Sequence, residues 1–127
     1  MAQLITEYQE AVKTTAIYRQ GIDDLLNSGY SKETLDAWLG IAYCTGKLNG
    51  EAGEIAEEVF KALRDDKALV TTERQDKLFK ELGDVCWYIA MLCNELGFHL
   101  EDVMNANLGK LIDRQSRGKL KGSGSDR

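Results

Sequence analysis

Apolar side chains recur every three or four positions along most of the chain, the spacing of one face of an α-helix. This spacing predicts a first helix over about residues 3–18, and it continues over about residues 31–64, 72–96 and 99–115. No stretch alternates between apolar and polar residues as a half-buried strand would. Four helices with short connections predict an all-α fold, an antiparallel four-helix bundle.

The ends of these helices carry local signals. Ser31 fits an N-cap, Thr72 with Gln75 matches a capping box, and Gly97 fits a C-terminal stop. A glycine and an Asn-Ser-Gly cluster between residues 21 and 29 interrupt the pattern and leave one or two helical turns between them. Four glycines lie inside the long second helix, and each costs about 1 kcal/mol relative to alanine. They require close helix packing, a close ligand, or a break near Gly46.

The charges are unevenly distributed along the 127 residues, whose net charge is −5. Residues 1–109 hold 19 acidic and 10 basic side chains, whereas residues 110–127 hold six basic and two acidic ones. The length predicts one domain over residues 1–117, followed by a basic Gly/Ser-rich tail over residues 118–127. The acidic balance argues against binding to a nucleic acid polymer or an anionic membrane. Self-attraction with solubility, or a ligand that combines metal and phosphate, would explain an acidic body with a basic tail.

Several classes of protein are excluded by simple features. The N-terminus lacks the basic segment of a signal peptide, and no apolar run reaches the roughly 20 residues of a membrane span. These features predict a cytoplasmic protein. His99 is the only histidine, which excludes His-rich zinc sites and the paired Glu-x-x-His motifs of di-iron bundles. Cys86 and Cys93 share a helical face and are predicted to be small core residues.

Two pairs of carboxylates have the spacing of one helix face. Glu51 and Glu54 are three positions apart in the second helix, and Glu81 and Asp84 are three apart in the third. Each pair lies beside inward-facing apolar residues, so all four are expected to border the seam between the two helices. Four converging carboxylates repel one another unless a cation binds. Oxygen ligands suit Mg²⁺ or Mn²⁺.

Spacing alone leaves a solvated acidic face as an alternative to the metal site. Two more glutamates follow the first pair, and Glu57 and Glu58 are predicted to face solvent. Lys61 lies four and three positions after them, respectively, and would pair with them there.

These motifs resemble a known family. The segments GEAGEIAE at residues 50–57 and KELGDVCWY at residues 80–88 resemble the ExxE and ExxD signature of the MazG-like nucleoside triphosphate pyrophosphohydrolases. Here 26 residues separate Glu54 from Glu81. Residues 7–9 and 15–18 look like the first helix of that family, and the C-terminal part resembles its short, phage-type members. Residues 20–36 look like a local insertion of unknown purpose.

The resemblance implies a Mg²⁺-dependent enzyme, with Mn²⁺ as a substitute, that cleaves a nucleoside triphosphate to a monophosphate and pyrophosphate. Two or more ions would clamp the phosphoryl oxygens and lower the pKa of a water molecule. The catalytic metal ligands would be Glu51, Glu54, Glu81 and Asp84. One of the glutamates would also accept the proton of that water, and the sequence leaves open which one.

Other residues are candidates for contacts with the substrate. Lys110 and Arg114 lie one turn apart and would bind the phosphates, with Lys61 as a second candidate and Asn107 for the sugar or a phosphate. Tyr88 lies one turn after the ExxD aspartate. A contact of Tyr88 with the base or sugar, and plain core packing, are both open.

The choice of substrate and the assembly are further expectations. The phage-type resemblance suggests a role in trimming or redirecting the deoxynucleotide pool, and a phage-encoded protein would act in the host cytoplasm. The expected substrate is a purine (dGTP-like) deoxynucleotide, with a pyrimidine (dCTP or dUTP) as the alternative. Family members are dimers or tetramers, and apolar residues on more than one face of the third helix, such as Ile89, Ala90 and Leu92, fit a homodimer or homotetramer. The bundle would then be completed by oligomerisation. A non-catalytic helical interaction module that keeps the fold is the alternative from another class.

Overall fold

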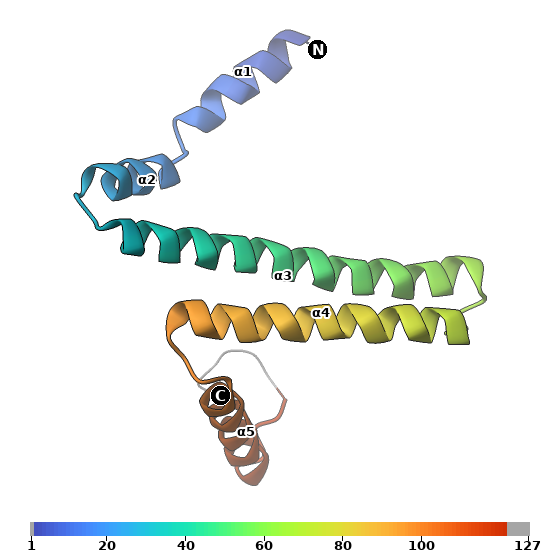
Figure 1. The fold of residues 1–127 in the computed structure, drawn as a ribbon. Helices are drawn as coiled ribbons and strands as arrows, with labels where there is room; N and C mark the ends of the chain where they lie inside the picture. Colours follow the sequence, from blue (N-terminus) through green and yellow to red (C-terminus); the bar gives the residue numbers. More distant parts are fainter. Residues whose placement is uncertain (1, 122–127) are drawn as a thin grey trace. The chain divides into compact units, whose positions relative to one another are not determined.

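The computed structural model describes residues 2–121, with side chains from residue 5 onward. Within this range the chain forms five α-helices and no β-strand (Figure 1). The helices are α1 (Ala2–Lys13), α2 (Tyr18–Asn27), α3 (Lys32–Asp65), α4 (Thr72–Leu96) and α5 (Leu100–Ser116). The predicted all-α fold is confirmed.

The first predicted helix ends about five residues early, and a fifth helix, α2, forms where the sequence left only one or two helical turns. Gly21, interpreted as a breaker, lies inside α2. α1 ends at Lys13 and α2 begins at Tyr18. Between them, the hydroxyl groups of Thr14 and Thr15 donate hydrogen bonds of 2.7 and 2.9 Å to backbone carbonyl oxygens three residues earlier. Such local bonds compete with the helical hydrogen bonds, and β-branched side chains are crowded in a helix. The apolar spacing continues through the break and therefore does not reveal it.

α3 is one continuous helix of 34 residues, with no break at Gly46. Ser31 caps its start as predicted, because its hydroxyl oxygen accepts a hydrogen bond from the backbone N–H of Thr34 at 3.3 Å. A Cβ atom on Gly40 would meet the carboxylate of Glu95 on α4, the flexible end of a long side chain that would have to shift. The other three glycines inside α3 have open space where a Cβ would stand.

α3 and α4 lie side by side and run in opposite directions (Figure 1). Near the start of α4, Arg74 donates a 2.9 Å hydrogen bond to Glu58 of α3, and it also bonds Asp66 in the connecting loop. Farther along, the rings of Tyr43 and Tyr88 have centroids 6.5 Å apart. These contacts set the register of the two helices, which decides which carboxylates meet.

α4 has caps at both ends, one of them displaced from the prediction. Thr71, and not Thr72, is the N-cap, and its hydroxyl oxygen accepts the backbone N–H of Arg74 at 3.4 Å. Gly97 adopts a left-handed conformation with φ of 72° and ends α4 as predicted. α5 is followed by Gly118 with φ of 65°. Most of the predicted basic tail, residues 122–127, lies outside the described residues.

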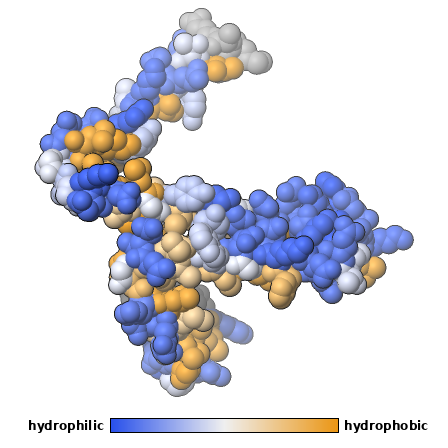
Figure 2. Space-filling model, in the orientation of Figure 1, coloured by the Kyte–Doolittle hydropathy of each residue, from blue (hydrophilic) through white to orange (hydrophobic). Residues whose placement is uncertain are grey.

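The chain divides into two compact units, Met1–Trp38 and Leu39–Arg127, here called the N-terminal and the C-terminal unit. In the described residues the buried apolar side chains are Cys44, Ala62 and Cys93. Cys86, predicted to be a core residue, is exposed. Figure 2 shows hydrophobic residues at the surface over α2 and over α5. None of the described helices is both long enough and apolar enough to cross a bilayer.

Candidate functional site

Three of the four predicted metal ligands converge in the C-terminal unit. Glu51 comes from the middle of α3, and Glu81 and Asp84 come from successive turns of α4. One carboxylate oxygen of each lies within 4.8 Å of the other two. Glu51 is buried, Glu81 is half-buried and Asp84 is exposed, so the group opens toward solvent on one side. We call these three residues the carboxylate cluster.

Glu54 is exposed and lies outside the carboxylate cluster. Its charge nevertheless acts on the cluster. Burial raises the pKa of Glu81, and the negative charges of Glu54, Asp84 and Glu51 raise that pKa further. The exposed fourth carboxylate therefore stands near enough to Glu81 to add to the negative potential of the site.

The donor set of the cluster fits a hard divalent cation. All three groups offer carboxylate oxygens, and no histidine or cysteine belongs to the cluster in the described residues. Carboxylate oxygens suit Mg²⁺ and Mn²⁺ rather than the softer metals. Burial and then the neighbouring carboxylates raise the pKa of Glu81, and a bound cation would offset both effects by favouring the charged form.

A lysine that the sequence analysis did not single out lies against the cluster. Lys47 of α3 places its Nζ 2.8 Å from Oε1 of Glu51, and this hydrogen bond raises the pKa of Lys47. The same ammonium lies 5.7 Å from the ring centroid of Tyr88 on α4. The four-residue spacing of Lys47 and Glu51 was a signal for this contact, but spacing does not show that the carboxylate is buried.

Tyr88 belongs to an aromatic cluster next to the carboxylates. Its ring meets that of Trp87 edge to face, with centroids 4.8 Å apart, and the ring of Tyr43 lies 6.5 Å away between centroids. Burial raises the pKa of Tyr88, and a hydrogen bond with Tyr43 contributes. Tyr88 is only half-buried, so this position offers both packing and an accessible ring.

Lys61 is held by two glutamates of its own helix. Its Nζ lies 3.0 Å from Glu57 and 3.3 Å from Glu58. The predicted exposure of Glu57 is confirmed, but that of Glu58 is wrong, because Glu58 is half-buried and bonds Arg74 of α4. Burial acts to raise the pKa of Glu58, but hydrogen bonds and charges of Lys61, Lys77 and Arg74 outweigh it and lower that pKa.

The remaining predicted site residues lie on α5. Asn107 and Lys110 are exposed, whereas Arg114 retains only 6% of its surface. None of the three belongs to the carboxylate cluster. A guanidinium held by its surroundings has a fixed direction, and planar donors of this kind suit carboxylate and phosphate groups.

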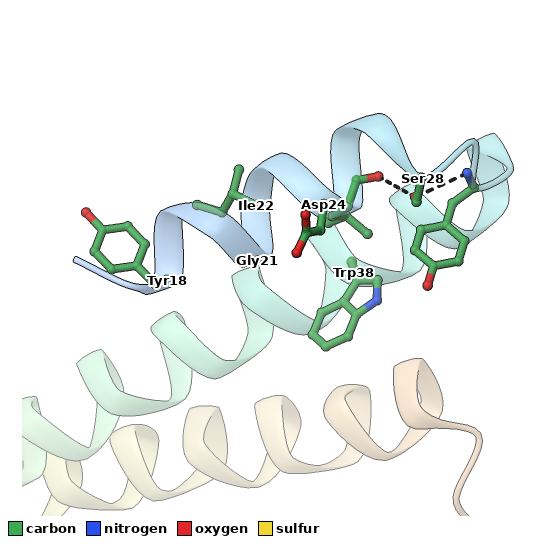
Figure 3. Close-up of a pocket in the computed structure, with 8 residues that line it drawn as sticks. Tyr18, Gly21, Ile22, Asp24, Ser28 and Trp38 are labelled. Carbon is green, nitrogen blue, oxygen red and sulfur yellow. Dashed lines mark hydrogen bonds between the residues drawn. The ribbon is translucent and has the colours of Figure 1, made fainter. Parts of the chain in front are cut away.

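The N-terminal unit contains a hollow of about 510 Å³. Figure 3 shows Tyr18 and Ile22 of α2 and Trp38 of α3 around it, with Asp24 as its acidic member. The predicted insertion at residues 20–36 supplies most of its lining. It contains none of the predicted metal ligands.

Comparison with known proteins identifies the family. The sequence model of the MazG nucleotide pyrophosphohydrolase domain matches residues 43–118. The chain is 45% identical over 120 residues to the Gene 37 protein of Mycobacterium phage L5, covering 94% of this chain and 96% of the phage protein. It is 39% identical over 74 residues to the uncharacterized protein YvdC of Bacillus subtilis (strain 168), covering 54% of this chain and 70% of YvdC. No solved structure matches the chain significantly. The matched region contains the carboxylate cluster, and the chain belongs to the MazG nucleotide pyrophosphohydrolase domain family.

Proposed function

We propose that this protein hydrolyses a nucleoside triphosphate to the monophosphate and pyrophosphate with the help of Mg²⁺. The observation that carries the proposal is the meeting of Glu51, Glu81 and Asp84, from the ExxE and ExxD motifs of two helices. Glu54, which is exposed and whose charge raises the pKa of Glu81, would be the fourth ligand of a bound ion. The match to the MazG nucleotide pyrophosphohydrolase domain supports this choice of reaction.

Different side chains would bind the metal, accept a proton and bind the phosphates. Mg²⁺ ions bound at the cluster would stabilise charge on the phosphoryl oxygens and acidify a water molecule. Glu51 keeps a fixed oxygen because it is buried and bonded, and one of the glutamates accepts the proton of the water. Lys110 and Arg114 bind the phosphates, with Asn107 and Lys61 as further contacts.

The aromatic cluster supports a contact of Tyr88 with the base. Tyr88 lies one turn after Asp84 on α4 and has an accessible ring, and a ring face stacks on any base. A purine offers the larger surface for stacking, so we propose a purine deoxynucleotide such as dGTP as the substrate. The pyrimidines dCTP and dUTP are the competing outcome.

A homodimer or homotetramer is part of the proposal. Large apolar residues are exposed on α4, among them Phe79 at 79% and Trp87 at 55%. A stable water-soluble chain would bury many of them against a second copy. Sedimentation at micromolar concentration should give a multiple of the 14.2 kDa chain mass, and a mass of one chain would refute the assembly.

The test of the reaction is a product analysis. The purified protein is incubated with each ribo- and deoxynucleoside triphosphate, with Mg²⁺ or Mn²⁺, and both products are identified. Monophosphate and pyrophosphate are expected, and EDTA should stop the reaction. Release of inorganic phosphate with a diphosphate would refute the mechanism. The absence of any hydrolysis would favour the non-catalytic module.

A further inference from the structure

Lys47 carries the positive charge that lies against the carboxylate cluster. Its Nζ is 2.8 Å from Oε1 of Glu51, whose side chain keeps only 10% of its surface exposed. Among residues 5–121, this is the only ion pair made by any of the four predicted metal ligands. A buried carboxylate is costly without a partner charge. Lys47 therefore serves as the internal cation of the site.

The order of Lys47 and Glu51 is the less favourable of the two for stabilising α3. Glu placed four positions before Lys stabilises a helix better than the reverse order, and Lys47 precedes Glu51. Glu73 and Lys77 on α4 have the favourable order, with 3.1 Å between their charged atoms. Both of these residues are exposed. The two pairs share their spacing and differ in the burial of the carboxylate, which makes Lys77 a matched control.

Lys47 also lies close to an aromatic ring on α4. Its Nζ lies 5.7 Å from the ring centroid of Tyr88, within the distance of about 6 Å at which a ring attracts a cation. The side chain of Lys47 is 42% exposed, and its four-carbon stem is flexible. The ammonium therefore stands at the edge of the cluster, between a carboxylate of α3 and a ring of α4, and it is free to turn toward solvent.

We propose that Lys47 is an exchangeable counter-ion and substrate-binding residue, which pairs with Glu51 in the free protein and turns to the phosphate chain when a divalent cation takes Glu51. A carboxylate oxygen that binds a dication no longer holds a nearby ammonium, because the two positive charges repel. The phosphates arriving with the cation offer the ammonium a new anion. The phosphate half of this inference rests on the proposed function, and the counter-ion half rests on the observed pair.

The first experiment measures Mn²⁺ binding to the nucleotide-free protein, by electron paramagnetic resonance of the free ion. Lys47→Met removes the competing charge and should bind Mn²⁺ about threefold to tenfold more tightly than wild type, with a larger effect at low salt. Lys47→Arg keeps the charge and should stay near wild type. Lys77→Met should leave Mn²⁺ binding unchanged.

The second experiment measures the affinity for a triphosphate analogue with an uncleavable α,β-imido bridge, at saturating Mg²⁺, by calorimetry. Lys47→Met should weaken this binding about tenfold, Lys47→Arg should restore most of it, and Lys77→Met should have no effect. In turnover with the natural substrate, the same loss should appear in KM and not in kcat.

The outcomes separate this inference from the proposed function. Unchanged or weaker Mn²⁺ binding by Lys47→Met would show that Lys47 merely holds Glu51 in place and would overturn the exchange. Unchanged affinity for the analogue would overturn the contact with phosphate. A wild-type protein that binds the analogue but hydrolyses no triphosphate would refute the proposed reaction. The Mn²⁺ and analogue affinities of the Lys47 variants would still test the exchange in that case.

Discussion

The two units differ in how much of their own sequence they bury. Every buried side chain in the described residues belongs to the C-terminal unit, and these are Cys44, Glu51, Ala62, Cys93 and Arg114. The N-terminal unit has none, and its aromatic residues Tyr18 and Trp38 are 64% and 54% exposed. The family match, residues 43–118, falls within the C-terminal unit. The relative from phage L5 is similar over 94% of the chain and so shares much of the N-terminal unit as well.

This contrast suggests that the C-terminal unit is the scaffold for the chemistry and that the N-terminal unit is an accessory segment. Two of the five buried side chains of the C-terminal unit, Glu51 and Arg114, are charged, although burying a charge is costly. A fold that accepts this cost keeps those groups for binding or chemistry, or pairs them closely. The N-terminal unit contributes an aromatic hollow and none of the predicted metal ligands. We therefore expect substitutions in the C-terminal unit to dominate activity.

The largest effect is expected for the proposed metal ligands of the C-terminal unit. Asp84→Asn should lower kcat about 100-fold or more, because the ligand acts on charge that develops in the transition state. Glu54→Gln should follow the same course, since its charge acts on Glu81. Steady-state turnover measures both.

Glu73→Gln is the control for these variants, because Glu73 is an exposed acidic residue of the same helix. It should keep wild-type turnover. A metal-ligand variant that also keeps wild-type turnover would place the metal site elsewhere.

A smaller effect is expected from the C-terminal end. Deleting residues 118–127 removes Lys119, Lys121, Arg127 and Asp126, a net loss of positive charge next to an acidic body. KM for the triphosphate should rise several-fold, more at low salt than at high salt, because screening weakens attraction between distant charges. Thermal stability without ligand should stay nearly unchanged. An unchanged KM at low ionic strength would show that the tail takes no part in binding.

The stability of the cluster should depend on pH through Glu81. Its pKa is raised in the folded protein by burial and by neighbouring carboxylates, so the folded state binds the proton more readily than the unfolded state. The free energy of unfolding should therefore gain from this group as the pH falls through the raised pKa, above the ordinary value of 4.5. Residues with lowered pKa, such as Glu58 and Asp65, act in the opposite sense.

Because of these opposing groups, the effect of Glu81 appears as a difference between two proteins. Denaturant unfolding of metal-free wild type and Glu81→Gln should show Glu81→Gln to be the more stable near neutral pH. The difference should shrink as the pH falls through the raised pKa of Glu81. Mg²⁺ should stabilise wild type and not Glu81→Gln. A difference that is constant with pH would contradict the role of Glu81 as the strained carboxylate.

The smallest effect is expected in the hollow of the N-terminal unit. Trp38→Ala removes an exposed side chain of that unit, so kcat/KM should stay within about twofold of wild type and the free energy of unfolding should fall by no more than about 0.5 kcal/mol. Steady-state kinetics and chemical denaturation measure the two quantities. A tenfold loss of kcat/KM would contradict the expectation that the N-terminal unit is an accessory segment for activity.

Local signals predicted the start of α3 and the end of α4. Ser31 caps α3 because its hydroxyl oxygen reaches the third backbone N–H after it, and Gly97 ends α4 because glycine tolerates a left-handed backbone. The ExxE and ExxD motifs indicated the right face of each helix for the same reason, since residues three apart share a face. The break at Thr14 and Thr15 was missed because side-chain hydrogen bonds, and not hydrophobic spacing, cause it.

The sequence by itself determined the all-α fold, the family and the four candidate carboxylates, because each follows from neighbours within one or two helical turns. Only the tertiary structure decided that Glu51 is buried while Glu54 is exposed, and that Lys47 and Tyr88 meet across two helices. It also showed that Glu58 bonds Arg74 and does not face solvent. These facts depend on the register of α3 against α4, which is set by contacts between residues far apart in the chain and therefore leaves no trace in local spacing.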